Sequence, residues 1–231
     1  MSESLTFDAG YLARGWLATH LATGADEETP VICGTLLIET FTDGVRLTAT
    51  DRTILLSTWV PCTNDDPEPS LDVAPDGVAV VRDPDGRGKA LLSYLRKLAA
   101  KAAKDGAPAP LVTLHVGVPA EEGDAAGFPG MELDTVVIDY PEHERVVLPT
   151  VNGTFPDYRT LLFGHTAKRT DIIGLSSDNF LRLGQAAKIL GGFIRCSLAG
   201  PKSAVGVEIG VAPSVRGVVM PIAIAEIEQV A

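Results

Sequence analysis

The sequence lacks the features that define several large classes of protein. No apolar run reaches the roughly 18 residues that a membrane-spanning helix needs, and the first residues have no basic start followed by an apolar stretch. Three of the 231 residues are cysteines, Cys33, Cys62 and Cys196, and no two of them form a C-x-x-C pair. We therefore expect no secretion signal, disulfide framework or zinc site, and predict a soluble protein of the reducing cytoplasm.

Catalytic motifs are also missing. The sequence contains no G-x-S-x-G and no H-E-x-x-H, and residues 164–170 (GHTAKRT) lack the second glycine of a phosphate-binding loop. The four histidines, His20, His115, His143 and His165, share no metal-ligand spacing. The sequence therefore predicts a protein that is not an enzyme and that needs no cofactor.

Charge is present but unevenly distributed. The chain has 30 acidic and 19 basic residues, a net charge of −11, which by itself argues against binding to phosphates. Residues 64–85 carry seven acids and residues 120–144 carry eight, whereas residues 86–104 between them carry six bases and no acid. Such segregation can create a positive surface on a negatively charged protein.

Apolar periodicity predicts three helices, at residues 8–22, 88–104 and 177–190. Asp8 can cap the first, and Gly191 follows the third. On a wheel of the second, leucines and alanines from Leu91 to Ala102 share one arc and the basic residues occupy the opposite arc. The alternative interpretation of this basic stripe is a solvent-exposed amphipathic helix.

Segments rich in Val, Ile, Leu and Thr predict extended structure between and after these helices. They are residues 31–42, 45–49, 53–60, 78–82, 111–118, 131–140, 145–151, 172–175, 193–198, 204–209 and 215–224. A helix beside about three strands thus occurs three times, at a spacing of roughly 75 residues. The predicted class is α+β, with antiparallel sheets covered by helices on one face.

Three stretches, taken together and in this order, resemble the bacterial sliding clamp, the β subunit of DNA polymerase III. They are GVRLTATDRTILLSTWVP (residues 44–61), VNGTFPDYRTLL (residues 151–162) and VVMPIAI (residues 218–224). The resemblance implies the DNA-clamp fold, a ring of subunits whose helices face duplex DNA. It also implies a processivity factor that tethers a polymerase, and a clamp loader as a further partner.

On this resemblance, basic helix residues would contact the phosphates of the duplex without regard to base sequence. The expected DNA-binding residues are Lys89, Arg96, Lys97, Lys101, Lys104, Arg182 and Lys188.

The resemblance also implies a hydrophobic pocket in which short peptide motifs of polymerases and repair proteins dock. Its expected lining is Thr50, Leu55, Pro156, Leu161, Val218, Met220 and Pro221. A methionine suits a groove that adapts to several partners. The alternative is that Leu55, Leu161 and Val218 are ordinary strand core.

The length departs from the family, whose chains have three domains. Residues 1–160 are expected to form one complete clamp-like domain, and residues 161–231 a shortened second one. With the family's dozen inner helices, three per chain would require four chains; a two-domain chain would instead form a trimer.

The small size suggests a bacteriophage or mobile-element source. The alternative function is a clamp-derived regulatory module that binds peptides or DNA without closing a ring, and a third is a decoy of the host clamp or loader.

Overall fold

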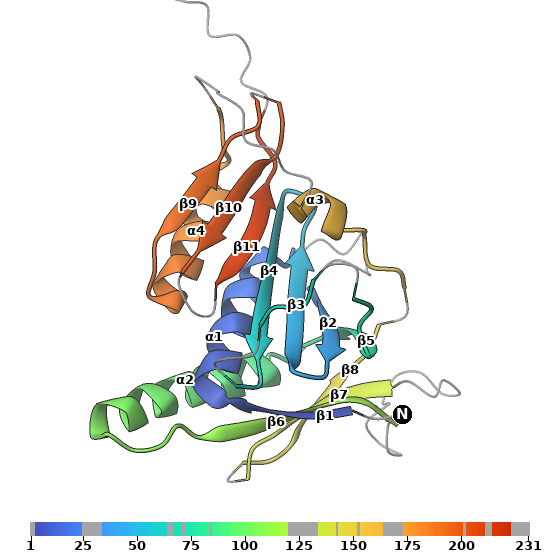
Figure 1. Cartoon of the computed structure of the whole chain (residues 1–231), viewed down its shortest axis with the longest axis vertical. Coiled ribbons are helices and arrows are strands. Elements are labelled where there is room, and N and C mark those ends of the chain that lie inside the picture. The colour runs from blue at the N-terminus through green and yellow to red at the C-terminus, as the bar shows by residue number, and fades with distance from the viewer. Residues whose placement is uncertain are drawn as a thin grey trace, which may run out of the picture.

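Three long helices lie along one face of two antiparallel sheets (Figure 1). The computed structural model describes residues 3–24, 34–63, 67–70, 73–83, 85–119, 134–141, 143–151, 153–163, 173–200, 202–210 and 214–222. In chain order the elements are β1 (Glu3–Asp8), α1 (Ala9–Thr19), the 3-10 helix η1 (His20–Ala22), β2 (Thr35–Phe41), β3 (Gly44–Thr50), β4 (Ile54–Pro61), β5 (Gly77–Arg82), α2 (Arg87–Asp105), β6 (Leu111–Pro119), β7 (Asp134–Asp139), β8 (Val146–Pro149), α3 (Arg159–Phe163), α4 (Ser177–Leu190), β9 (Ile194–Ser197), β10 (Val205–Ile209) and β11 (Val215–Val219).

The strands form a four-stranded sheet, β1-β6-β7-β8, and a seven-stranded sheet, β5-β2-β3-β4-β11-β10-β9. The larger sheet is continuous because β11, near the end of the chain, pairs with β4, with Val218 opposite Leu55. The C-terminal strands therefore extend a sheet that the first eighty residues begin.

Helix boundaries follow from local chemistry. The Asp8 carboxylate accepts hydrogen bonds from the backbone N–H groups of Gly10 and Tyr11, at 2.7 and 3.1 Å, and so caps α1. Gly106 and Gly191 end α2 and α4 in the left-handed conformation, at φ of 68° and 69°.

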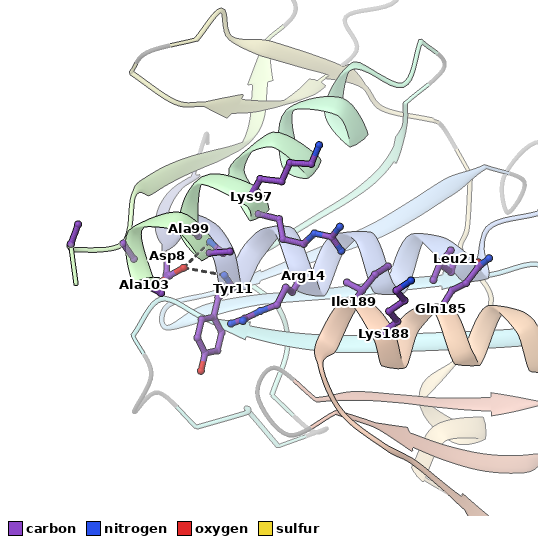
Figure 2. Close-up of a pocket in the computed structure, with 15 residues that line it drawn as sticks. Asp8, Tyr11, Arg14, Leu21, Lys97, Ala99, Ala103, Gln185, Lys188 and Ile189 are labelled. Atoms are coloured by element: carbon purple, nitrogen blue, oxygen red, sulfur yellow. Dashed lines mark hydrogen bonds between the residues drawn. The ribbon is translucent and has the colours of Figure 1, made fainter. Parts of the chain in front are cut away.

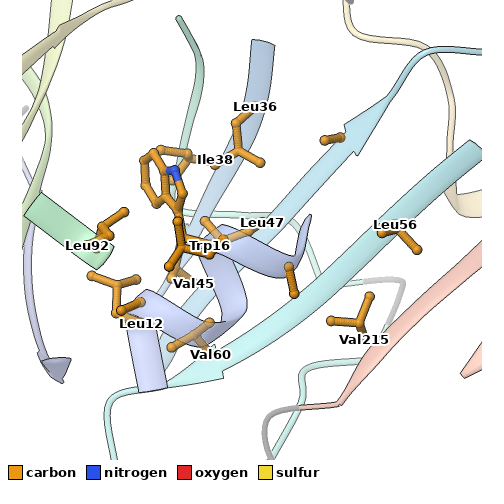
Figure 3. Packing of buried hydrophobic residues seen from close by; sticks show 14 of the residues in the cluster. Leu12, Trp16, Leu36, Ile38, Val45, Leu47, Leu56, Val60, Leu92 and Val215 are labelled. Carbon is orange, nitrogen blue, oxygen red and sulfur yellow. The ribbon is translucent and has the colours of Figure 1, made fainter. Parts of the chain in front are cut away.

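Alternation along β3 separates the two faces of the large sheet. Val45, Leu47 and Ala49 belong to the main core beneath the helices, and Arg46 and Thr48 point to the other side. Trp16 of α1 is 2% exposed and packs among core residues of β2, β3 and α2 (Figure 3). The core thus fills the space between helices and sheets.

The three predicted helices and the repeated modules are confirmed, and α4 has the predicted bounds. Two elements were missed, β1 and the short α3, and β11 ends at Val219, earlier than expected. The expected strand at residues 172–175 is, within the described part, a single bridge between Gly174 and Ile222. Cys33 and residues 120–133 lie outside the described residues.

A close approach between α1 and β4 gives the first prediction. A Cβ added at Gly15 would lie 2.7 Å from Val60 Cγ2 and 3.1 Å from Thr58 Cγ2. We expect Gly15→Ala to lower the free energy of unfolding by about 1–3 kcal/mol, measured by urea unfolding. The sign is diagnostic, because alanine in place of glycine inside a helix normally adds about 0.5–1 kcal/mol. A more stable variant would contradict this packing.

Candidate nucleic-acid and peptide interfaces

The three helices enclose an open groove with a volume of 790 Å³ (Figure 2). Its walls come from α1, α2 and α4, and its basic side chains are Arg14, Arg96, Lys97 and Lys188. The acid at its edge, Asp8, already accepts the two backbone hydrogen bonds that cap α1. The groove is therefore positively charged and lies on the helical face of the molecule.

Arg14 is the functional candidate that the sequence analysis missed. Its guanidinium carbon lies 4.9 Å from the centre of the Tyr11 ring, an arrangement that fixes the side chain by a cation–π contact. Its Nε is buried and has no hydrogen-bond partner among the described residues. A lone arginine in an otherwise apolar helix gave no charge-cluster signal; only the packing of three helices places it beside Lys97.

The other predicted DNA-binding residues differ in their exposure and in their ion pairs. Lys89, Lys101 and Lys104 are exposed along α2, and Arg96 is half-buried at the groove. Arg182 forms an ion pair with Asp51, at the turn between β3 and β4, and is 30% exposed. Part of its charge is therefore neutralised within the protein, and it contributes less to a phosphate-binding surface than expected.

The positive field at the N-terminal end of α2 acts on a neighbouring histidine. Burial lowers the pKa of His20 below its usual value, and the charge of Lys89 lowers it further, while Asp83 opposes the change. The imidazole is consequently neutral at pH 7. His20 thus adds no positive charge to this surface.

Asp51 organises the T-A-T-D turn. One carboxylate oxygen accepts hydrogen bonds from the Thr53 and Ile54 amides at 2.9 and 3.0 Å, and the other pairs with Arg182 of α4. Burial acts to raise the pKa of Asp51, but the hydrogen bonds from Arg182, Ile54 and Thr53 outweigh it, so the pKa lies below its usual value. This aspartate fastens α4 to the first half of the chain.

The opposite face of the large sheet carries a second, smaller apolar cluster. Its buried members are Leu37, Leu55, Val80, Tyr158 and Val218, and Phe155 and Leu162 pack against them. Two residues of the predicted peptide pocket, Leu55 and Val218, are only 4% exposed here. They form the floor of this cluster, and the strand-core alternative describes their burial correctly.

Polar contacts hold the F-P-D-Y-R segment over this cluster. Glu39 of β2, itself buried, accepts a hydrogen bond from the Tyr158 hydroxyl and another from Arg159 Nη2 at 2.8 Å. Burial and the Glu39 carboxylate raise the pKa of Tyr158. The segment is thus tied to the sheet by a buried acid that the sequence did not single out.

The remaining predicted pocket residues lie around this cluster with different exposure. Leu161 is 50% and Met220 44% exposed, Pro156 is exposed and Pro221 is half-buried. Thr50 is buried, and its hydroxyl donates to the Ile54 carbonyl oxygen at 2.9 Å. The exposed apolar surface around this cluster therefore comes from Leu161 and Met220 rather than from Leu55 or Val218.

Part of the acidic loop after β4 lies on the same face of the large sheet, opposite the helices, which we call the outer face. Glu68 forms ion pairs with Arg46 at 3.2 Å and Arg216 at 3.1 Å, and the Arg46 side chain is only 1% exposed. These pairs secure residues 67–70 to the sheet on the side opposite the helices. On this face one carboxylate is thus shared by two guanidinium groups.

No group of three or more histidine, cysteine, aspartate or glutamate side chains among the described residues could hold a metal ion. No helix among these residues is both long and apolar enough to cross a membrane.

The two sheets with helices on one face define an α+β fold of the DNA-clamp class, as the resemblance predicts. The structure is similar to a DNA polymerase sliding clamp from Pseudomonas aeruginosa, with a TM-score of 0.62, 15% identity, and coverage of 96% of this chain and 67% of that one. It is also similar to the Helicobacter pylori beta clamp in complex with 3,4-difluorobenzamide, with a TM-score of 0.58, 12% identity, and coverage of 96% and 66%. A third neighbour is the C. crescentus beta sliding clamp, with a TM-score of 0.53, 16% identity, and the same coverage of 96% and 66%.

The chain therefore spans about two thirds of the length of these bacterial clamps. No protein-family model matches the sequence, and no curated protein matches it. At this level of identity, the likeness establishes the fold.

The Asp51–Arg182 pair gives a prediction on stability. We expect Asp51→Asn to lower the free energy of unfolding at pH 7 by about 1–3 kcal/mol, because it removes a charge-assisted hydrogen bond. Since the pKa of folded Asp51 is lowered, its contribution is complete above its unfolded value of about 3.9 and is lost as pH falls through the folded value. The stability difference between wild type and variant should therefore narrow in acid.

Urea unfolding over a pH series measures this difference. Asp105→Asn, at an exposed helix end, is the matched control and should leave the midpoint nearly unchanged. A wild-type-to-variant difference that stays constant down to strongly acidic pH would contradict the assignment.

Proposed function

We propose that this protein is a DNA sliding clamp, a processivity factor that encircles duplex DNA and tethers a polymerase through a peptide-binding surface. The observation that carries the proposal is the groove of α1, α2 and α4, with Arg14, Arg96, Lys97 and Lys188 around it. The similarity of the fold to bacterial sliding clamps supports it. A homo-oligomeric ring in the cytoplasm, loaded by a clamp loader and encoded by a phage or other mobile element, belongs to the same proposal.

Exposed lysines on helices suit sliding better than a specific site would. Contacts between flexible ammonium groups and phosphates carry no base sequence information and are salt-dependent, so each is easily exchanged along the duplex. Lys97, Lys101 and Lys104 are exposed on one helix and are free of the ion pairs recorded for the described residues. They are therefore able to exchange phosphates as the protein moves.

Reversing two of these charges tests the DNA-binding face. We expect Lys97→Glu combined with Lys101→Glu to weaken binding to a labelled duplex by at least about tenfold. Loss of two phosphate contacts should also reduce the slope of log affinity against log salt by about 1.8. Fluorescence anisotropy over a salt series measures both quantities.

The control must carry the same change in net charge. Lys202→Glu with Arg145→Glu provides it, because both side chains are exposed and neither lines the groove. Equal weakening by the two double variants would indicate a general charge effect and reject a specific helical interface. Unchanged binding by the Lys97 and Lys101 variant, with peptide binding intact, would favour the alternative of a peptide-binding module without a DNA-encircling ring.

The peptide-binding surface is tested separately at Met220. We expect Met220→Asp to reduce binding of a labelled peptide carrying a bacterial polymerase clamp-binding motif by at least about tenfold, because it places a charge on an apolar contact. Leu111→Asp is the matched control, since Leu111 is 60% exposed on β6, in the other sheet. Persistent binding to the Met220 variant would show that the peptide surface lies elsewhere.

A further inference from the structure

Each module is a helix with the three strands that follow it: α1 with β2, β3 and β4; α2 with β6, β7 and β8; and α4 with β9, β10 and β11. In the first two modules, the strand that precedes each helix pairs with a strand of the other module. The strand before α1, β1, pairs with β6 of the second module, and the strand before α2, β5, pairs with β2 of the first. The two helices run in opposite directions, since Gly10 near the start of α1 approaches Ala99 late in α2, and His20 after α1 lies in the field of Lys89 early in α2. The exchange is therefore reciprocal, and a local twofold axis relates the two modules.

The third module also has an extended segment before its helix, at the position that β5 occupies before α2. In the second module, β5 is bridged to the residues after β8: Val81 bridges Thr150, and the Val151 amide donates to the Val80 carbonyl at 2.7 Å. In the third, Gly174 bridges Ile222, and the Ile222 amide donates to the Gly174 carbonyl at 3.0 Å. Residues 173–175 thus sit before α4 as β5 sits before α2.

The reciprocal partner is missing from the described part of the chain. The strand equivalent to β2 in the third module is β9, at the outer edge of the large sheet (Figure 1). β9 pairs with β10 on one side, and no strand among the described residues pairs with its other edge. An open strand edge favours pairing with another chain.

The side of α4 that faces away from α1 is also uncovered. Leu175, Phe180, Leu181 and Gly184 line an open hollow of 730 Å³ on this side, and Gln185 and Lys188 line both this hollow and the basic groove. Phe180 is 60% exposed, Phe193 just before β9 is 53% exposed, and a Cβ added at Gly184 would meet nothing within 4 Å. In the first two modules the equivalent surface is occupied, because a Cβ on Gly10 would lie 2.8 Å from the Ala99 Cβ.

We propose that a second copy of this chain docks here about a twofold axis, so that two half-domains complete one clamp domain. Residues 173–175 of each copy pair with β9 of the other, and the two α4 helices pack antiparallel. A second copy fits because the exchange in the first two modules is reciprocal: the third module supplies both the strand that is needed and the edge that needs it. The interface rests on strand and helix pairing and not on DNA binding.

The α1–α2 contact predicts where the axis falls. Gly10 and Ala99 are the second and thirteenth residues of their helices, so the axis lies between the seventh and eighth positions. In α4 these positions are Leu183 and Gly184. Of the two, Leu183 is buried against the sheet and Gly184 is open, so the Gly184 residues of two copies face each other near the axis.

Disulfide cross-linking of the full chain tests this arrangement. The test variant is Gly184→Cys in a background of Cys33→Ser, Cys62→Ser and Cys196→Ser. Cysteines near a twofold axis come within the Cα separation of about 4.4–6.8 Å that a disulfide requires. We expect mild oxidation to produce a discrete dimer and no larger ladder, because a twofold contact closes on itself. Ala100→Cys, exposed on α2, is the control and should give at least tenfold less dimer.

Light scattering on a second variant keeps the result independent of cysteine chemistry. Phe180→Asp should halve the mass of the assembly, and Leu111→Asp, a change at a residue 60% exposed on β6, should not. A wild-type chain that remains single at all concentrations, cross-linking no greater than the control, or an unchanged mass for Phe180→Asp would each overturn the proposal. A monomeric wild type would mean that another protein or another segment covers this surface.

A DNA-binding assay on the same variants distinguishes a wrong interface from a wrong proposed function. Phe180→Asp leaves Lys97 and Lys101 in place, so duplex binding by the Lys97 and Lys101 variant and assembly of the Phe180 variant are independent readouts. Loss of the interface with normal charge-dependent binding would reject only the interface. An intact interface with no effect of the lysine changes would reject only the DNA-binding face.

Discussion

The burial of α1 between two other helices and the large sheet is the constraint on which the remaining structure depends. Gly10 lets α2 approach and Gly15 lets β4 approach, and Trp16 fills the core between the strands and α2. The same helix contacts α4, which β11 brings into place by pairing with β4. Because α1 is the central member, the basic residues of α2 and α4 are brought to its two sides, and Arg14 lies between them. Close helix packing therefore produces the charged groove.

Ion pairing differs between the two faces of the large sheet. On the face opposite the helices, Glu68 pairs with both Arg46 and Arg216, and Glu39 pairs with Arg159. On the helical face, Lys97, Lys101 and Lys104 are exposed. A net charge of −11 is thus compatible with a positive helical surface. If two copies join through α4 and β9, each pair contributes six inner helices, so that the family's dozen correspond to four chains.

Features encoded by local pattern could be predicted from the sequence. The helix over residues 177–190 has strong apolar periodicity between a serine and a glycine, and the basic arc of residues 88–104 follows from helical spacing alone. Features that depend on distant pairing could not. β1 has alternating exposure and pairs with β6, more than a hundred residues away. Arg182 forms an ion pair with Asp51, and the Tyr158 hydroxyl donates a hydrogen bond to Glu39. The motif that suggested a pocket did not reveal that Tyr158 itself covers Leu55 and Val218.

Electron microscopy of the purified protein shows whether its chains form a ring, because a sliding clamp must enclose its DNA. We expect a closed ring with a central hole wide enough for a duplex. We also expect α1, α2 and α4 of every chain to line that hole and the sheets to form the outer layer. A particle without a hole, or a ring with the helices on its outer surface, would contradict the proposed sliding clamp.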